Sequence, residues 1–238
     1  MGAKITISSK LNSQNVVANT SNITVDVYIN WDSGTYSTTG NCAVSMIVNG
    51  TKYSATSFTF NSGRTNSGSA KIKTVTVNVA HGSDGKKTVS YSASADTDVV
   101  SWTLTASGSK TLTAIPVAYT LTLSAGAGTT LTANRKSSPS GLTGAVASGA
   151  KIWAGDVIKF SASASAGYGN IAVKVNNAAY TIGSAYTVST NTTAVSSAEL
   201  QGSAYIGNQR YLCYIWTGSK FEQYVPYLYD GTAWKILA

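Results

Sequence analysis

A short pattern repeated near the C-terminus restricts what can form there. The segment Tyr214-Ile-Trp-Thr-Gly-Ser-Lys-Phe-Glu-Gln223 returns thirteen residues later as Tyr227-Leu-Tyr-Asp-Gly-Thr-Ala-Trp-Lys-Ile236. Each copy reads aromatic, apolar, aromatic, then a turn pair ending in glycine, then another aromatic residue. This order predicts a short strand, a tight turn and a second strand. We therefore expect two small β-hairpins at the end of the chain.

These hairpins carry aromatic side chains that they cannot bury alone, because an isolated two-stranded hairpin is too small. The side chains need a partner on the preceding domain or on another chain. The candidate interaction surface consists of Tyr214, Trp216, Phe221, Tyr227, Tyr229 and Trp234. Aromatic faces could form a buried hairpin core or an exposed platform for sugar rings, and we favour the buried core.

Composition indicates an all-β protein. The chain has 238 residues, enough for one large or two medium domains, and only 11% of them are charged. Gly, Ser, Thr, Ala, Val and Asn dominate, whereas the residues that sustain long helices are few. The apolar content of 43% and the regular alternation argue against disorder.

The net charge of +8 arises from a deficit of acids rather than from a basic cluster. Only Lys86-Lys87 and Arg135-Lys136 are adjacent basic pairs, so we predict no nucleic-acid partner and only some attraction to anionic partners. No apolar run is long enough to span a membrane, and the first residues lack the apolar stretch of a signal peptide. We expect synthesis in a cytoplasm without an export signal, and no membrane insertion.

Alternation along the first half predicts a β-sandwich. Ile23, Val25, Val27 and Ile29 alternate with polar residues, as in a half-buried strand. Further strands are expected at 43–48, 57–60, 73–79, 88–95 and 101–105. Turns at this spacing are typical of an Ig-like or jelly-roll-like sandwich, and Pro116 favours a domain end at residue 115. The predicted domains are therefore a sandwich over 1–115, a small β repeat domain over 116–200 and the hairpin element over 201–238.

Glycine-rich corners in the second unit are interpreted as turns. No helix is expected after Gly126-Ala-Gly128, so this segment lacks the helix N-terminus that would bind phosphate.

The single histidine and the two cysteines have structural interpretations. His81 lies in the loop before Asp84-Gly85, where its ring can hydrogen-bond the loop backbone; a base or metal ligand is the alternative, but no second histidine completes a metal set. Cys42 and Cys213 lie far apart outside any ligand motif. We expect two buried thiols, with a disulfide as the alternative.

The nine acidic residues form no recognisable catalytic constellation. Asp84-Gly85 and Asp230-Gly231 have the order of turns that an Asp side chain caps. Asp96-Thr-Asp98 is one acidic pair, which supplies too few oxygens for calcium. We predict that the protein is not an enzyme and has no catalytic residue, cofactor or metal.

Three segments resemble known families. Lys73-Thr-Val-Thr-Val-Asn-Val-Ala-His-Gly-Ser-Asp-Gly-Lys-Lys-Thr-Val-Ser-Tyr-Ser-Ala93 resembles a β-sandwich module of minor structural proteins from long-tailed bacteriophages of Gram-positive bacteria. The second unit resembles an internalin-type bacterial surface repeat at Tyr119-Thr-Leu-Thr-Leu, Gly155-Asp-Val-Ile-Lys-Phe160 and Val173-Lys-Val-Asn176. It departs from that pattern at Asn191-Thr-Thr-Ala-Val195. The C-terminal hairpins are similar to motifs that close many phage tail and baseplate proteins.

The resemblance implies a virion protein attached to the tail or baseplate. It implies partners among other virion proteins, a homo-oligomer that buries the aromatic tail, and host adhesion through cell-wall carbohydrate as a second role. A capsid-surface decoration protein and a carbohydrate-binding receptor-recognition protein remain alternatives. The families supply no catalytic residue that can be carried over to this chain.

Overall fold

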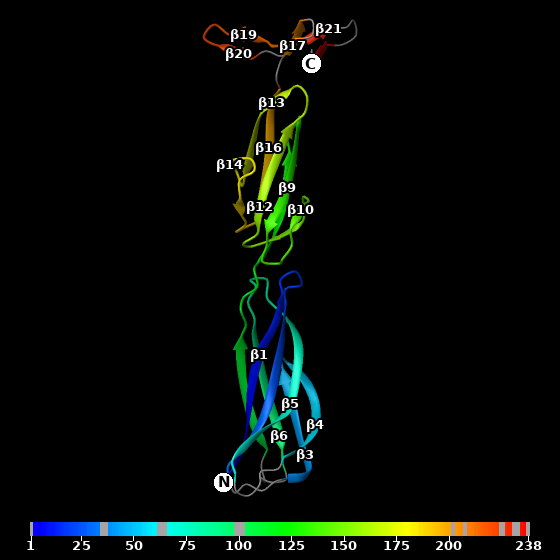
Figure 1. The fold of residues 1–238 in the computed structure, drawn as a ribbon, viewed down its shortest axis with the longest axis vertical. Coiled ribbons are helices and arrows are strands. Elements are labelled where there is room, and N and C mark those ends of the chain that lie inside the picture. Colours follow the sequence, from blue (N-terminus) through cyan, green and yellow to red (C-terminus); the bar gives the residue numbers. More distant parts are fainter. Residues whose placement is uncertain are drawn as a thin grey trace. The chain divides into compact units, whose positions relative to one another are not determined.

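The computed structural model describes residues 2–33, 38–60, 66–97, 103–200, 203–206, 209–223, 227–229 and 234–236. The chain divides into two compact units, Met1–Val117 and Ala118–Ala238 (Figure 1). The hairpins, which we had predicted as a separate element from residue 201, fall within the second unit. The described residues contain strands and no helix, which confirms the all-β prediction.

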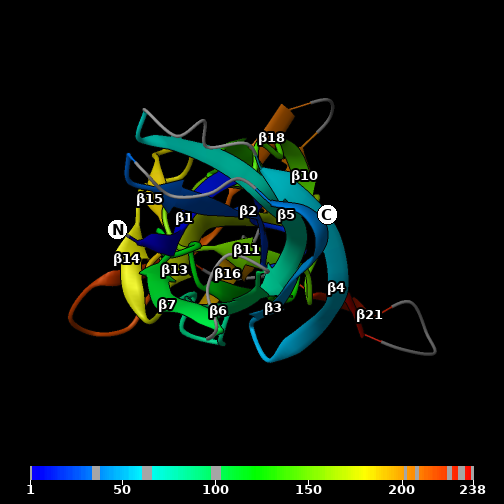
Figure 2. The ribbon, with the colours of Figure 1, turned by 90° about the horizontal axis from the view of Figure 1, so that it is seen from below.

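The described residues of the first unit form seven strands. They are β1 (Ala3–Asn15), β2 (Thr20–Trp31), β3 (Thr38–Val48), β4 (Thr51–Phe60), β5 (Gly68–Ala80), β6 (Thr88–Asp96) and β7 (Leu104–Thr111). One sheet has the order β1-β2-β5 and the other β4-β3-β6-β7, and Figure 2 shows the two sheets as opposite layers. All neighbouring strands are antiparallel. This strand order is that of an Ig-like sandwich, with strands A, B and E facing C′, C, F and G.

The core between these sheets follows the alternation in the sequence. Ile23, Val25, Val27 and Ile29 on β2 are fully buried and pack against residues of the other sheet such as Val44. On β6, which forms where a strand was predicted over 88–95, Val89, Ala93 and Ala95 are buried and Tyr91 is half-buried, so these alternate residues make the inward face. The strand predicted over 101–105 instead begins at Leu104; Trp102 lies outside the described residues.

The second unit contains a second two-sheet core. Its strands are β8 (Ala118–Ala125), β9 (Thr129–Ser137), β10 (Gly144–Val146), β11 (Lys151–Trp153), β12 (Val157–Ala164), β13 (Tyr168–Val175), β14 (Ala178–Tyr180), β15 (Tyr186–Thr187) and β16 (Thr192–Leu200). The sheets have the orders β10-β9-β12-β15 and β11-β8-β16-β13-β14, in which β16 and β8 are parallel. Leu121, Ile152, Ile158 and Phe160 are fully buried between them.

Two segments singled out in the sequence of this unit form a turn and a strand. Gly126-Ala-Gly128 connects β8 to β9, and the Thr129 amide donates to the Gly126 carbonyl at 3.1 Å. Within Asn191-Thr-Thr-Ala-Val195, where the resemblance weakens, residues 192–195 form the start of β16 and pair with β8, and Ala194 and Val195 also pair with β13.

Three hairpins follow in the C-terminal part. They are β17 (Ser203–Ile206) with β18 (Gln209–Leu212), β19 (Tyr214–Trp216) with β20 (Phe221–Gln223), and β21 (Tyr227–Tyr229) with β22 (Trp234–Ile236). The last two are the hairpins that the repeat predicts. The sequence does not predict the first, because the residues of β17 and β18 lack the aromatic order of the later copies.

Candidate functional site

The β19–β20 hairpin presents the best-described part of the predicted aromatic surface. Trp216 and Phe221 occupy directly opposite positions on the two strands, and their ring centroids lie 5.0 Å apart with planes at 55°. The Thr217 amide and hydroxyl both donate to the Lys220 carbonyl at 3.0 Å, which closes the loop. An aromatic pair therefore forms where the loop joins the strands, as expected for a cross-strand contact.

This hairpin exposes large apolar side chains on both faces. Tyr214 is 55% exposed, Trp216 54% and Phe221 70%. Ile215, which alternates with its neighbours and points to the other face, is 51% exposed. The expectation of a buried hairpin core is wrong for these residues within a single chain, because three-residue strands are too short to enclose large rings.

The charges on this hairpin cancel. The Lys220 ammonium lies 2.9 Å from the Glu222 carboxylate, and both side chains are well exposed. An exposed pair of this kind contributes little to folding. The hairpin is therefore a locally neutral, largely aromatic surface, suited to apolar contacts or to stacking on rings.

The third hairpin repeats the same backbone register. Tyr229 lies opposite Trp234, five residues further along the chain, as Phe221 lies opposite Trp216. The side chains of Tyr227, Tyr229 and Trp234 lie outside the described part of the structure. Of the six predicted residues, the structure thus brings Trp216 and Phe221 into contact and places Tyr214 on the same short strand.

His81 has the structural role that the sequence favoured. It is buried, and its Nδ1 lies 2.7 Å from the Gly85 carbonyl oxygen, which can only accept a hydrogen bond. Nδ1 must therefore carry the hydrogen. Its Nε2 lies 2.7 Å from the Ser21 hydroxyl oxygen, which completes the hydrogen bonds of the ring. His81 joins the loop to β2.

The remaining predicted chemistry is structural or lies outside the described residues. The Asp84 carboxylate accepts a hydrogen bond from the Lys86 amide at 3.0 Å and so caps its own turn. Asp96 accepts from the Thr103 hydroxyl at 2.8 Å. Asp98 and the Asp230-Gly231 turn are not among the described residues.

Neither cysteine is part of a disulfide. Cys42 is buried as predicted, but Cys213 is only half-buried, because it lies between two short hairpins rather than in a sandwich core.

An ion pair that sequence reasoning missed lies in the second unit. Arg135 Nε is 2.8 Å from Asp156 Oδ2, without the alignment of a hydrogen bond, and both side chains are almost completely buried. The same oxygen accepts a hydrogen bond from the Trp153 amide at 3.1 Å, and the guanidinium lies over the Trp153 ring. These contacts explain why the Gly155-Asp-Val-Ile-Lys-Phe160 motif has an aspartate at position 156: its carboxylate pairs with Arg135 and accepts a hydrogen bond from the Trp153 amide.

Searches of the described ranges found no group of three or more His, Cys, Asp or Glu side chains that could hold a metal ion. Within the same ranges, no helix has the length and apolarity to cross a membrane. Comparison with family models, with curated proteins and with solved structures gave no match to this chain.

Proposed function

We propose that this chain is a non-enzymatic structural and interaction protein of a bacteriophage particle, associated with the tail or baseplate. It would act in particle assembly and in adhesion to the host surface. The observation that carries the proposal is the β19–β20 hairpin, where Tyr214, Ile215, Trp216 and Phe221 are all more than half exposed. The resemblance of the chain to phage structural modules supplies the biological setting.

An apolar surface of this kind favours association. Removing aromatic and aliphatic surface from water is favourable, and large exposed apolar surfaces usually mark interaction sites. Copies of one chain arranged around a symmetry axis present the same hairpin repeatedly, so one surface can serve every subunit. Self-association through the hairpins is therefore the assembly step that we propose.

Two other functions use the same features. A capsid decoration protein would attach through one end and project Ig-like domains. A receptor-recognition protein would stack Tyr214, Trp216 or Phe221 on cell-wall sugars, and the tilted Trp216–Phe221 pair favours this second candidate because it exposes two ring faces.

Electron cryomicroscopy of intact particles tests the location. We expect density for this chain at the tail or baseplate. Density on the capsid would overturn the tail assignment and favour decoration, and absence of the chain from purified particles would overturn the virion role.

Light scattering of the purified full chain tests the assembly step. The wild-type protein should self-associate, and Trp216→Ser combined with Phe221→Ser should shift it toward the monomer. Leu142→Ser is the matched control, because Leu142 is a 43% exposed apolar residue away from the hairpins in sequence. A wild-type protein that remains monomeric at all concentrations would contradict self-association through this surface.

A further inference from the structure

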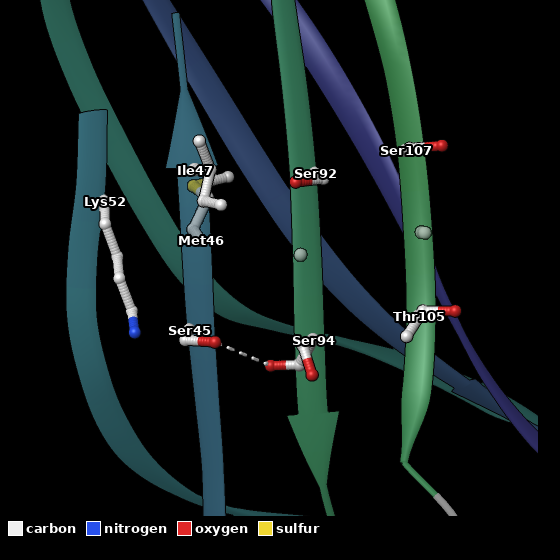
Figure 3. Close-up of a pocket in the computed structure, with 10 residues that line it drawn as sticks. Ser45, Met46, Ile47, Lys52, Ser92, Ser94, Thr105 and Ser107 are labelled. Atoms are coloured by element: carbon white, nitrogen blue, oxygen red, sulfur yellow. Dashed lines mark hydrogen bonds between the residues drawn. The ribbon is translucent and has the colours of Figure 1, made fainter. Parts of the chain in front are cut away.

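A hollow lined by hydroxyl groups lies on the outer face of the β4-β3-β6-β7 sheet (Figure 3). Its volume is about 630 Å³. A smaller hollow of about 400 Å³ continues it along β6 and β7, because both are lined by Ile47, Ser92 and Ser107. Together they form an open trough across strands of the first unit. Volumes in this range suit small ligands or short polymer segments.

The sequence produces this surface by strict alternation. On β6, Ser90, Ser92 and Ser94 alternate with the buried core residues Val89, Ala93 and Ala95 and the half-buried Tyr91. On β7, Thr105, Ser107 and Ser109 occupy the corresponding outward positions. The register then places Ser92 opposite Ser107, Ser94 opposite Thr105 and Ser90 opposite Ser109. Three rows of paired hydroxyls therefore cross the two strands.

Most of these hydroxyls have no protein partner. In the described part of the chain, the Ser45 hydroxyl makes one long hydrogen bond, 3.5 Å to the Ser94 carbonyl, whereas the side-chain hydroxyls of Ser92, Ser94, Thr105 and Ser107 make none. Ser92 and Ser94 are half-buried, so their access to bulk water is reduced. Their hydrogen-bonding capacity is directed at whatever fills the hollow.

The outer face of the opposite sheet also carries polar side chains, and several of them are hydrogen-bonded to each other. There Thr24 and Thr76 are hydrogen-bonded to each other at 2.9 Å. Asn22 and Asn78 pair at 2.7 Å, and Asn30 donates to Thr6 at 2.9 Å. These side chains are therefore paired across the strands of that face. The unpaired hydroxyls of Ser92, Ser94, Thr105 and Ser107 contrast with these pairs and leave their hydrogen-bonding groups available to a ligand.

Two other side chains define the chemistry of the trough. Among the described residues that line the main hollow, Lys52 on β4 is the charged one, and Figure 3 shows its side chain beside β3. Ile47, opposite Lys52 in the register, is 42% exposed and provides an apolar contact. The surface thus combines hydroxyls, one apolar side chain and one positive charge.

We propose that this trough binds an extended polyhydroxylated polymer with acidic groups, such as an acidic glycan. A hydroxyl both donates and accepts hydrogen bonds, so rows of serine and threonine complement a ligand whose own groups do the same. Ile47 contacts carbon-bound hydrogens of the ligand, and the Lys52 ammonium pairs with a carboxylate or phosphate. An extended peptide fits less well, because peptides add to free sheet edges, whereas β3 and β6 are paired on both sides.

The site is independent of the proposed assembly role, because it lies in the first unit and uses none of the C-terminal aromatic residues. Loss of hairpin association would leave it intact, and failure of ligand binding would leave the virion proposal untouched.

Calorimetry or NMR titration of the full chain tests the proposal with three probes. Oligogalacturonate supplies carboxylates, oligomeric glycerol phosphate supplies phosphates, and maltoheptaose is a neutral comparison. We expect at least one acidic probe to bind at millimolar concentration or better, and more tightly than maltoheptaose. The tighter acidic probe identifies which anion the site takes.

Matched variants localise the binding. Ser92→Val with Ser107→Val removes two facing hydroxyls while keeping residues that favour strands, and should weaken binding by about tenfold. Lys52→Gln should weaken acidic probes severalfold and leave maltoheptaose unchanged. The control is Thr24→Val with Thr76→Val, a facing hydroxyl pair on the opposite sheet, which should leave binding unchanged.

Three results would overturn the proposal. They are no binding of either acidic probe, equal affinity for maltoheptaose and the acidic probes, and unchanged binding by the Ser92→Val, Ser107→Val variant with a wild-type melting temperature. If that variant unfolds, chemical-shift changes in the wild-type protein decide: shifts at Ser92, Ser94 and Ser107 support the site, and shifts confined elsewhere refute it.

Discussion

His81 donates a 2.7 Å hydrogen bond from Nδ1 to the carbonyl oxygen of Gly85. The Ile115 amide donates to the same oxygen at 2.9 Å. The Gly85 carbonyl thus holds the β5–β6 loop together through the buried His81 ring of that loop. It also ties the loop to the last residues of the first unit. The Asp84-Gly85 turn is therefore a structural joint of the sandwich.

Gly85→Ala should destabilise the first unit strongly. Gly85 has a φ of +74°, and an added Cβ would lie 1.9 Å from the Ile115 carbonyl oxygen. The backbone must shift and weaken the joint, so we expect a loss of about 3 kcal/mol or more in the free energy of unfolding. Gly50→Ala is the matched control, with a φ of +81° but no atom within 4 Å of the added carbon. It should cost only about 1 kcal/mol. Calorimetric melting measures both, and equal losses would contradict the steric argument.

His81→Phe should also destabilise the first unit. The change removes the hydrogen bond to Gly85 and leaves the hydroxyl of Ser21, which is almost completely buried, without its partner. We expect a loss of about 2–3 kcal/mol, measured by urea unfolding. Wild-type stability should not respond to a chelator or to added zinc. A zinc-dependent rise in melting temperature that His81→Phe abolishes would instead support a metal role.

Alternation and turn chemistry made the sandwich and the repeated hairpins predictable. Apolar and polar residues alternate strictly from Ile23 to Ile29, so this pattern predicted one buried face. An Asp before Gly, as in Asp84-Gly85, predicted a turn capped by the Asp side chain. The first hairpin, β17–β18, lacks the repeated aromatic order and was missed. The sequence also did not predict the exposure of Trp216, because the same aromatic pattern occurs in buried cores and on exposed surfaces.

The trough and the buried ion pair were missed for a different reason. Ser90, Ser92 and Ser94 show in sequence only that one face of β6 is polar; which hydroxyls they face depends on the register with β7. Arg135 and Asp156 are 21 positions apart, and no local pattern pairs them. Contacts of this kind require knowledge of which strands become neighbours.

Asp156→Ala should destabilise the second unit by about 3–5 kcal/mol, because it leaves the buried Arg135 guanidinium without its counter-charge. Urea unfolding measures the loss. Arg135→Met combined with Asp156→Ala removes both charges and should cost less than Asp156→Ala alone. A double variant that loses as much as the sum of both single variants would show that the two charges do not interact.

Trp216→Ala should separate association from folding. Trp216 is 54% exposed and its ring contact is with Phe221 on the same hairpin, so the chain loses little buried surface when the ring is removed. We expect the free energy of unfolding of the two sandwich units to change by less than about 0.5 kcal/mol. Self-association, measured by sedimentation velocity across a range of concentrations, should weaken by about tenfold or more, because aromatic residues dominate many interfaces.

Phe160→Ala is the comparison variant. Phe160 is fully buried in the second unit, and its loss should lower the free energy of unfolding by about 3–5 kcal/mol. If Trp216→Ala instead lowered the melting temperature of dilute monomer as Phe160→Ala does, the aromatic hairpin would be part of a core and not an interaction surface.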